Sequence, residues 1–282
     1  MKRAVPKPVR YDQVGEWSEL KLEILRKYAT AYSTILARKG LHHAYIDGFA
    51  GAGRAISRRT KEMIPGSPLN ALNVEPPFKY YYLVDLDASR VGELRRLTAD
   101  RQNVYVFGGD ANSILLSEVF PRIRFEDYRR ALCVLDPYGL HLNWTIIKAA
   151  AELGTIEIFL NFPVADMNRN VLWRSEGASD QNIQRMNAFW GDESWREVAY
   201  SVNANLFGDL EAEKQPNRVV ADAFRERLRT VAGFRYVPEP APMRNSVGAI
   251  VYYLFFAAHQ PAAGKIVTDI LDAYRERGLL RG

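Results

Sequence analysis

Apolar residues recur at three- and four-residue steps over residues 16–36, the spacing of one face of an amphipathic helix. Gly40 follows this stretch and is expected to close the helix. Further along, short apolar runs alternate with longer stretches that are compatible with helices. The strands predicted from these runs are residues 43–46, 80–84, 104–107, 131–135 and 156–160. This alternation predicts an α/β fold, with a mostly parallel sheet and helical crossovers.

The second half of the chain has a different pattern. Residues 166–217 are largely polar with tryptophans among them, which predicts a helical insertion or cap. An amphipathic helix is expected over residues 218–231 and a terminal helix over residues 266–277. Two β-like runs, residues 234–237 and 249–256, predict an antiparallel hairpin that completes the sheet at one edge.

We expect a single domain over all 282 residues. Its parts are an N-terminal arm and helix (1–40), a core (41–165), the insertion (166–217) and the C-terminal helix and hairpin (218–282). The first ten residues hold two prolines and four basic residues, which predicts a flexible arm.

Composition narrows the class of protein. With 48% hydrophobic residues the chain can bury one large core, and a net charge of +5 is compatible with a polyanionic partner without requiring one. The single cysteine, Cys133, lies in an apolar run, which excludes an intrachain disulfide and predicts a buried thiol. Neither a signal peptide nor a membrane span is indicated, so a cytoplasmic location is expected.

Four of the predicted strands run into an aspartate: Asp47, Asp85, Asp110 and Asp136. Ligands of open α/β sheets bind outside the carboxyl ends of the strands, so these acids are expected to surround one crevice. The alternative for any one of them is an ordinary helix cap. Their repetition in order favours the crevice.

A glycine-rich turn follows the first strand: Asp47-Gly48-Phe49-Ala50-Gly51-Ala52-Gly53. Its spacing is neither the Gly-x-Gly-x-x-Gly of dinucleotide sites nor a Walker motif. A carboxylate repels phosphates but suits the sulfonium and ammonium groups of S-adenosylmethionine, so this cofactor is favoured over NAD or ATP. The expected cofactor contacts are Asp47, Gly48, Phe49, Ala50, Gly51 and Gly53.

The next two strand ends extend the predicted cofactor site. Asp85 is expected to accept from both ribose hydroxyls, with Asp87 as the second choice, and Asp110 is placed where the adenine amino group donates. Leu86 and Ala111, which follow the two acids, complete these contacts.

The reaction-centre candidate is Asp136-Pro137-Tyr138-Gly139, after the fourth strand. In this arrangement the acid and a backbone carbonyl accept from an exocyclic NH2 group while the ring stacks on a base, so the nitrogen lone pair points at the methyl carbon. The alternative is an Asp-Pro turn without chemistry. Asn161-Phe162-Pro163 at the fifth strand end either lines the substrate pocket or only terminates the strand.

Basic and aromatic residues elsewhere are candidates for phosphate contacts and base stacking, or are a solvated surface with core tryptophans. They are Arg54, Arg58, Arg59, Lys61, Trp173, Arg174, Arg185, Trp190 and Arg196. No two histidines have a metal-ligand spacing, so no metal site is expected. His141 is either a proton shuttle or an ordinary surface histidine.

The ordered set of motifs resembles the three-Cys-motif partner protein family. The resemblance rests on the glycine-rich turn, Gly66-Ser67-Pro68, Asp136-Pro137-Tyr138-Gly139 and Asn161-Phe162-Pro163. It implies a Rossmann-like class I methyltransferase fold, S-adenosylmethionine as cofactor, S-adenosylhomocysteine as product, and a three-Cys-motif iron–sulfur partner. The loop that carries Gly66-Ser67-Pro68 either folds back over the cofactor, with Ser67 as a contact, or is a plain surface turn. The Asp-Pro-aromatic-Gly order also resembles the motif of tRNA guanine-N2 methyltransferases.

These observations lead to two hypotheses. The first is an S-adenosylmethionine-dependent methyltransferase acting on an amino group of RNA, DNA or a nucleobase-like substrate. The second is a methyltransferase-like module that binds the cofactor, or the iron–sulfur partner, without methyl transfer. A nicotinamide-dependent oxidoreductase is disfavoured by the glycine spacing.

Overall fold

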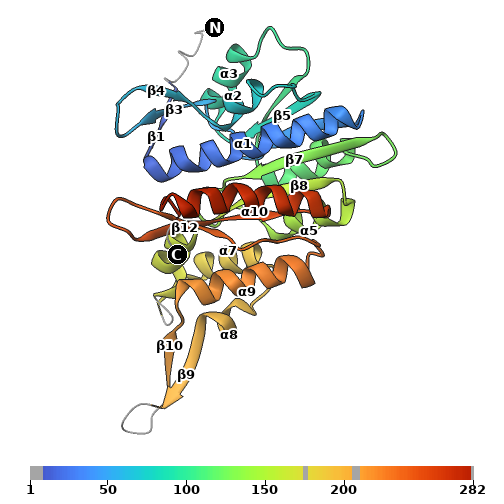
Figure 1. Ribbon diagram of the computed structural model, residues 1–282. Helices are drawn as coiled ribbons and strands as arrows, with labels where there is room; N and C mark the ends of the chain where they lie inside the picture. The colour runs from blue at the N-terminus through green and yellow to red at the C-terminus, as the bar shows by residue number, and fades with distance from the viewer. Residues whose placement is uncertain (1–8, 174–176, 205–209, 281–282) are drawn as a thin grey trace, which may run out of the picture.

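A seven-stranded sheet forms the centre of the protein in the computed structural model, which describes residues 9–173, 177–204 and 210–280 (Figure 1). Most of the arm predicted for residues 1–10 lies outside these ranges. In spatial order the strands are β6 (Val104–Gly108), β5 (Tyr80–Asp85), β2 (His42–Asp47), β7 (Arg129–Leu135), β8 (Ile156–Phe162), β12 (Ile250–Ala257) and β11 (Ala241–Arg244). The pairs from β6 to β8 are parallel, whereas β12 runs antiparallel to β8 and to β11.

The chain starts the sheet in its middle. From β2 it builds outward through β5 and β6, then returns to the other side of β2 with β7 and β8. The strand order therefore reverses between β2 and β7, a topological switch point where α/β folds bind ligands. The mostly parallel sheet with an antiparallel C-terminal pair is the Rossmann-like class I methyltransferase fold predicted from the sequence.

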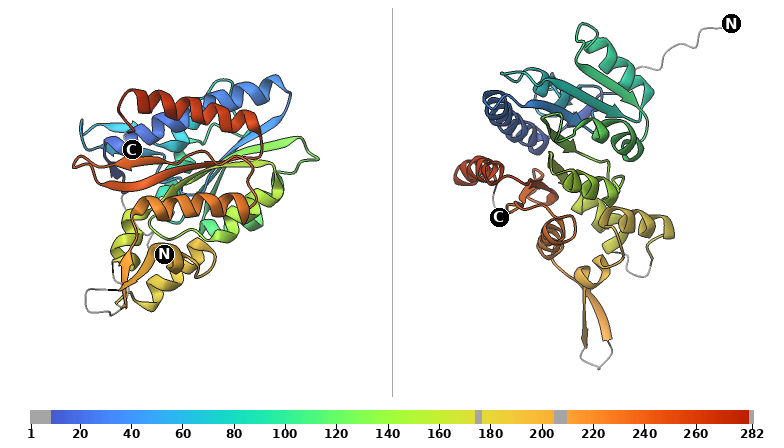
Figure 2. Two further views of the ribbon diagram at one scale, coloured as in Figure 1. Left: turned by 60° about the horizontal axis from the view of Figure 1, so that its bottom comes forward. Right: turned by 90° about the vertical axis from the view of Figure 1, so that its right-hand side faces the viewer.

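Helices cover both faces of the sheet, giving three layers (Figure 2). One face carries α1 (Glu16–Arg38), α2 (Ser67–Leu72), α3 (Ala88–Leu97) and α10 (Pro261–Glu276). The other carries α4 (Ala111–Ile114), π and 3-10 turns (Leu115–Val119, Phe120–Arg122), α5 (Trp144–Leu153), α7 (Asp180–Trp190), α8 (Trp195–Ala199) and α9 (Asn217–Thr230). Because both faces are covered, the central strands are apolar almost throughout, as in β7, where Cys133 is fully buried as predicted.

The helix predicted before the first strand is α1, and it lies beside α10 across the front of the sheet in Figure 1. Its apolar stripe buries Ile24, Tyr28 and Tyr32 against strands and α10. Gly40 follows its end with φ +68°, which a residue without a Cβ adopts freely, so the predicted stop is confirmed.

The edge strand of the C-terminal pair differs from the prediction. Residues 234–237 form no strand and contribute one isolated bridge, from Tyr236 to Ala258. The strand is β11, which contains Pro242. A proline lacks the N–H of a central strand but is tolerated at a sheet edge, which is where β11 lies. The terminal helix also starts earlier than predicted, with Pro261 in its first turn.

The insertion between β8 and α9 is mainly helical, as expected. It comprises α6 (Val164–Met167), a π turn (Asn168–Leu172), α7 and α8, followed by a hairpin of β9 (Tyr200–Ala204) and β10 (Leu210–Lys214) that was not predicted. The hairpin projects from the body at the bottom of Figure 1. Trp190 and Trp195 are each 1% exposed and belong to the core, so neither is a stacking surface. Trp173 is 71% exposed, and Arg174 lies outside the described residues.

A small second sheet was also not predicted. It pairs β1 (Asp12–Val14) with β3 (Arg54–Ser57), and β3 with β4 (Met63–Pro65). Of these strands, β3 and β4 fill the long interval between Gly53 and α2. The sheet brings the segment preceding α1 against the chain that leaves the glycine-rich turn.

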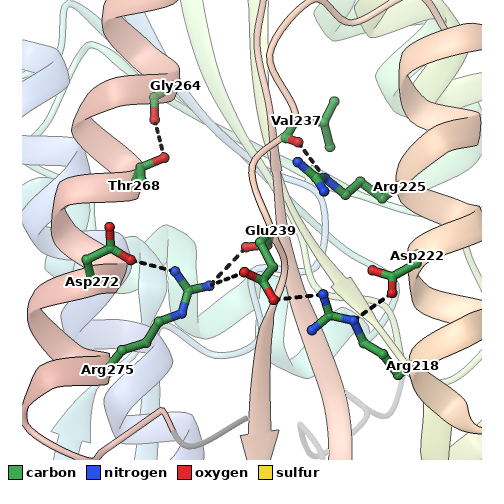
Figure 3. Close-up of polar contacts among 9 residues, drawn as sticks. All are labelled: Arg218, Asp222, Arg225, Val237, Glu239, Gly264, Thr268, Asp272 and Arg275. Atoms are coloured by element: carbon green, nitrogen blue, oxygen red, sulfur yellow. Dashed lines mark hydrogen bonds and ion pairs between the residues drawn. The ribbon is translucent and has the colours of Figure 1, made fainter.

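The C-terminal elements are joined on the surface by a carboxylate between two helices (Figure 3). Glu239 accepts from Arg218 of α9 at 2.7 Å and pairs with Arg275 of α10 at 3.9 Å. Arg225 of α9 donates to the carbonyl of Val237 at 2.7 Å. The Arg218 hydrogen bond lowers the pKa of Glu239.

None of the described helices has the length and apolar character that crossing a bilayer requires.

Candidate functional site

The glycine-rich turn begins where β2 ends, at the switch point. Gly51 and Gly53 have φ +62° and +78°, the left-handed region that favours glycine. A Cβ on Gly53 lies 3.1 Å from a methyl of Leu94 in α3, and one on Gly48 lies 3.3 Å from Leu115. The glycines are therefore required by the turn itself and by close packing beneath it.

Asp47 is enclosed beneath this turn. It is fully buried, and its carboxylate accepts from the N–H of Phe49 (3.2 Å), the hydroxyl of Ser67 (2.6 Å) and the hydroxyl of Tyr45 (3.3 Å). Burial raises its pKa to about 6. Asp47 lines neither of the two cavities described below, whereas Ser67 lines one of them. Its carboxylate thus fixes the turn and Ser67, rather than facing a ligand as the sequence predicted.

The predicted cofactor residues of three strands surround one cavity of about 610 Å³. Its wall includes Gly48, Phe49, Asp85, Leu86, Asp87, Asp110 and Ala111. The leucine is 77% exposed, an unusual position for an apolar side chain that gives the cavity an apolar wall. The acids that end β2, β5 and β6 are thus not equivalent, because only those of β5 and β6 reach this cavity.

Asp85 joins two of these strand ends. One carboxylate oxygen accepts from the N–H of Gly51 and the other from the N–H of Asp87, each at 2.8 Å. Burial raises its pKa. Asp87 instead caps α3, accepting from the N–H groups of Ser89 and Arg90, so the helix-cap alternative describes this residue. Asp110 stands at the start of α4 without a cap bond from its side chain.

A second cavity of about 600 Å³ adjoins the first, and both are lined by Phe49 and Tyr138. Its wall also includes the rest of the glycine-rich turn from Ala50 to Gly53, Ser67, the Asp136-Pro137 pair, Asn161, Lys21 of α1 and Tyr252 of β12. Sequence motifs far apart in the chain thus meet at this second cavity. Of the predicted reaction centre, Asp136 and Pro137 line only this cavity, whereas Tyr138 lines both.

Asp136 carries a partner on each carboxylate oxygen. Lys21 of α1 forms an ion pair with Oδ2, and Asn161 of β8 donates to Oδ1 at 2.6 Å. Burial disfavours the Lys21 ammonium, but the charge of Asp136 and the nearby Tyr252 outweigh it, so the pKa of Lys21 is raised. The Oδ1 atom of Asn161 is buried and has no hydrogen-bond partner among the described residues. This Asn161 oxygen is therefore a hydrogen-bond acceptor without a donor, next to Asp136.

Tyr138 is held by residues that the sequence analysis did not single out. Its hydroxyl donates to Asp12 of β1 at 2.6 Å and accepts from Arg90 of α3 at 2.7 Å, while Arg90 also pairs with Asp12 at 2.7 Å. We call this set the Asp12–Arg90–Tyr138 clamp. It connects the reaction-centre segment to β1 and α3 and leaves the Tyr138 residue 56% exposed. No local pattern identifies Asp12 or Arg90.

The basic candidates divide into two groups. Arg54 and Arg58 line the second cavity, together with Arg169 of the insertion, and none of the three has an ion pair among the described residues. Arg185 and His141 line the first cavity. In the other group, Arg59 pairs with Glu19 at 3.7 Å, Arg196 pairs with Glu193 at 3.8 Å, and neither these residues nor Lys61 lines either cavity. Within the described ranges, no group of three potential metal ligands occurs.

No family model matches the sequence, and no curated protein matches it. Among solved structures, the chain is similar to Trm1 from Pyrococcus horikoshii in complex with S-adenosyl-L-methionine, at 10% identity and TM-score 0.45, over 96% of this chain and 61% of that one. It is also similar to the N-methyltransferase NodS from Bradyrhizobium japonicum with S-adenosyl-L-homocysteine, at 11% identity and TM-score 0.41, over 87% and 89%. A protein from Legionella pneumophila is similar at 13% identity and TM-score 0.44, over 90% and 92%. At such values these neighbours carry no argument about chemistry, and the strand order of the sheet defines the fold.

Proposed function

We propose that this protein is an S-adenosylmethionine-dependent methyltransferase that acts on an exocyclic amino group of a nucleic acid or a nucleobase-like substrate. The observation that supports this most is the pair of adjoining cavities at the switch point, which share Phe49 and Tyr138. One cavity has the acids and apolar wall that suit a nucleoside. The other has the reaction-centre motif.

The first cavity and the glycine-rich turn fit the cofactor. Asp85 accepts from the ribose hydroxyls, Asp110 accepts from the adenine amino group, and Leu86 covers the base with apolar surface. Gly51 and Gly53 let the methionine portion approach the backbone, with Ser67 at the same wall. When bound, S-adenosylmethionine supplies an electrophilic methyl group.

The second cavity suits a substrate amine, whose N–H groups donate hydrogen bonds to the wall and whose nitrogen accepts the methyl group. The Oδ1 atom of Asn161, which has no partner among the described residues, accepts an N–H of the target amine, and Asp136 accepts another. Tyr138 presents its ring to the base. Holding the amine in this way aligns its lone pair, so the catalytic contribution of these residues is mainly proximity and orientation.

Charge on the wall of the second cavity favours a nucleic acid over an uncharged amine. Arg54, Arg58 and Arg169 are exposed, line this cavity and have no ion-pair partner among the described residues. Arginines in this state suit phosphate groups, which they bind through charge and directional hydrogen bonds.

A second candidate function is a module that binds the cofactor but transfers no methyl group. It is favoured by one observation: Lys21 and Asn161 occupy both oxygens of Asp136, and the Asp12–Arg90–Tyr138 clamp occupies the Tyr138 hydroxyl. In that case the chain would serve the three-Cys-motif iron–sulfur partner that the family resemblance implies.

Transfer of a tritiated methyl group to total RNA, DNA and cell protein separates the two candidates. The methyltransferase proposal predicts label in a nucleic acid fraction, with a loss of about 100-fold or more in Asp136→Ala. The half-buried, ion-paired Asp127 gives a matched control, because it lines neither cavity and Asp127→Ala should retain transfer. Cofactor binding without transfer to any fraction supports the second candidate. Transfer that survives in Asp136→Ala excludes the assigned reaction centre.

A further inference from the structure

A third cavity of about 400 Å³ lies on the α1 and α10 side of the sheet, and it shares no lining residue with the two cavities of the proposed site. It is lined by the C-terminal half of α1, the starts of β7 and β8, and the first turn of α10. Lys21, at the reaction centre, is near the other end of α1. The cavity is thus separate from the site but borders the same helix.

The carboxyl group of Glu157 lies in the wall of this cavity and forms no ion pair among the described residues. Glu157 of β8 lines the cavity, and its Oε2 accepts from the hydroxyl of Tyr28. No ion pair of Glu157 occurs among the described residues, and Oε1 receives no hydrogen bond there. Burial raises its pKa to about 7. Glu157 is partly buried, and acidic side chains are rarely withdrawn from water unless they are paired.

Two further polar groups of the same wall have no partner within the described chain. Tyr32 is 5% exposed and its hydroxyl makes no hydrogen bond. The Nε2 atom of His259 is also buried and unpaired. Burial lowers the pKa of His259, which keeps the ring neutral and leaves one nitrogen as an acceptor. Buried polar groups in folded proteins are normally satisfied, so Tyr32 and His259 are two exceptions in one wall. The free Oε1 of the partly exposed Glu157 is a third polar group there that a bound molecule would complete.

The rest of the wall describes the shape and charge of that group. Ile35, Leu36 and Ile266 are apolar, and Tyr28 and Tyr32 add aromatic rings, a residue type that attracts cations. The basic residues of the wall, Lys39 and Arg130, lie on different elements, at the end of α1 and in β7, and neither is within ion-pair distance of Glu157. Glu157 can therefore accept a hydrogen bond from a cationic group of a ligand. The apolar walls favour a ligand that also carries a hydrocarbon or aromatic body.

We propose that this cavity is a binding site for a small organic amine with an apolar body, whose ammonium group donates to Glu157. The volume is that of a small-molecule site. The proposal is independent of methyl transfer, because it uses none of the residues of the adjoining cavities.

Isothermal titration with phenethylamine and with 2-phenylethanol tests the proposal, because the two probes share a shape and differ in the ammonium group. Phenethylamine is expected to bind with 1:1 stoichiometry, at least about tenfold tighter than the alcohol. Its affinity should increase as the pH rises through about 7 and Glu157 ionises. The other titratable and charged groups of this wall are Tyr28, which contacts Glu157, and Tyr32, His259, Arg130 and Lys39.

Variants assign the binding to this cavity. Glu157→Gln should reduce phenethylamine affinity to that of the alcohol, and Ile266→Trp should block both probes by filling the cavity. Asp136→Asn should bind phenethylamine as the wild type does. Loss in Asp136→Asn with retention in Glu157→Gln would place the amine at the other cavities and overturn the proposal. Equal affinity for the two probes, or no binding of either, would also overturn it.

Discussion

Glu157 makes the stability of the protein depend on pH in a direction that can be calculated. Its pKa is raised from 4.5 to about 7, chiefly by burial, so the folded state binds its proton more tightly than the unfolded state. The associated stability is fully present below pH 4.5 and is lost as the pH rises through about 7. Above that range the ionised group costs about 3 kcal/mol, at 1.36 kcal/mol for each pH unit between the two values.

Glu157→Gln removes this cost and retains an oxygen that accepts from Tyr28. We therefore expect the variant to gain stability relative to the wild type by about 2 kcal/mol between pH 5.5 and 8.5. Urea unfolding followed by tryptophan fluorescence at several pH values measures the difference. Glu276→Gln, at an exposed position that ends α10, is the matched control and should keep a constant difference. Parallel stability curves for the wild type and Glu157→Gln would refute the reasoning.

Three further variants test the site. Gly53→Ala places a Cβ at φ +78° and 3.1 Å from a leucine methyl, so urea unfolding should show a loss of about 1–2 kcal/mol, and an unchanged midpoint would contradict the packing described. Lys21→Met leaves the partly exposed Asp136 without its cation and should cost about 1–2 kcal/mol in the same assay, whereas Lys21→Arg should restore most of it. Arg90→Met breaks the contact with Asp12, so hydrogen exchange of β1 should accelerate by about tenfold; unchanged exchange would show that the clamp does not hold this strand.

The central sheet follows from local sequence patterns, and its less regular parts do not. The four inner parallel strands appear as apolar runs because both of their faces are buried, and the helices that flank them keep a regular stripe. The edge strand β6 is also apolar in sequence but only partly buried. The edge strand β11 and the small sheet of β1, β3 and β4 are three or four residues long. Such short strands have too few positions for a periodic pattern, and their pairing comes from tertiary contacts.

The site divides in the same way. The glycine-rich turn and the strand-end acids could be read from residue order, and Asp85, Leu86, Asp110 and Tyr138 do line the cavities. The role of Asp47 could not be predicted from residue order. Whether its carboxylate faces a cavity or an internal hydroxyl depends on how α2 packs. The Asp12–Arg90–Tyr138 clamp could not be predicted from the sequence either. Asp12 and Tyr138 are 126 residues apart and share no motif.

Isothermal titration with S-adenosylmethionine, S-adenosylhomocysteine and NAD tests the cofactor assignment most directly. Asp85 is the residue to vary, because its two oxygens join the glycine-rich turn to the end of β5 in the wall of the first cavity. We predict that both sulfur nucleosides bind, that NAD does not, and that Asp85→Asn weakens S-adenosylmethionine binding by at least about tenfold. Absence of binding by either sulfur nucleoside, or tighter binding of NAD, would contradict the proposed function.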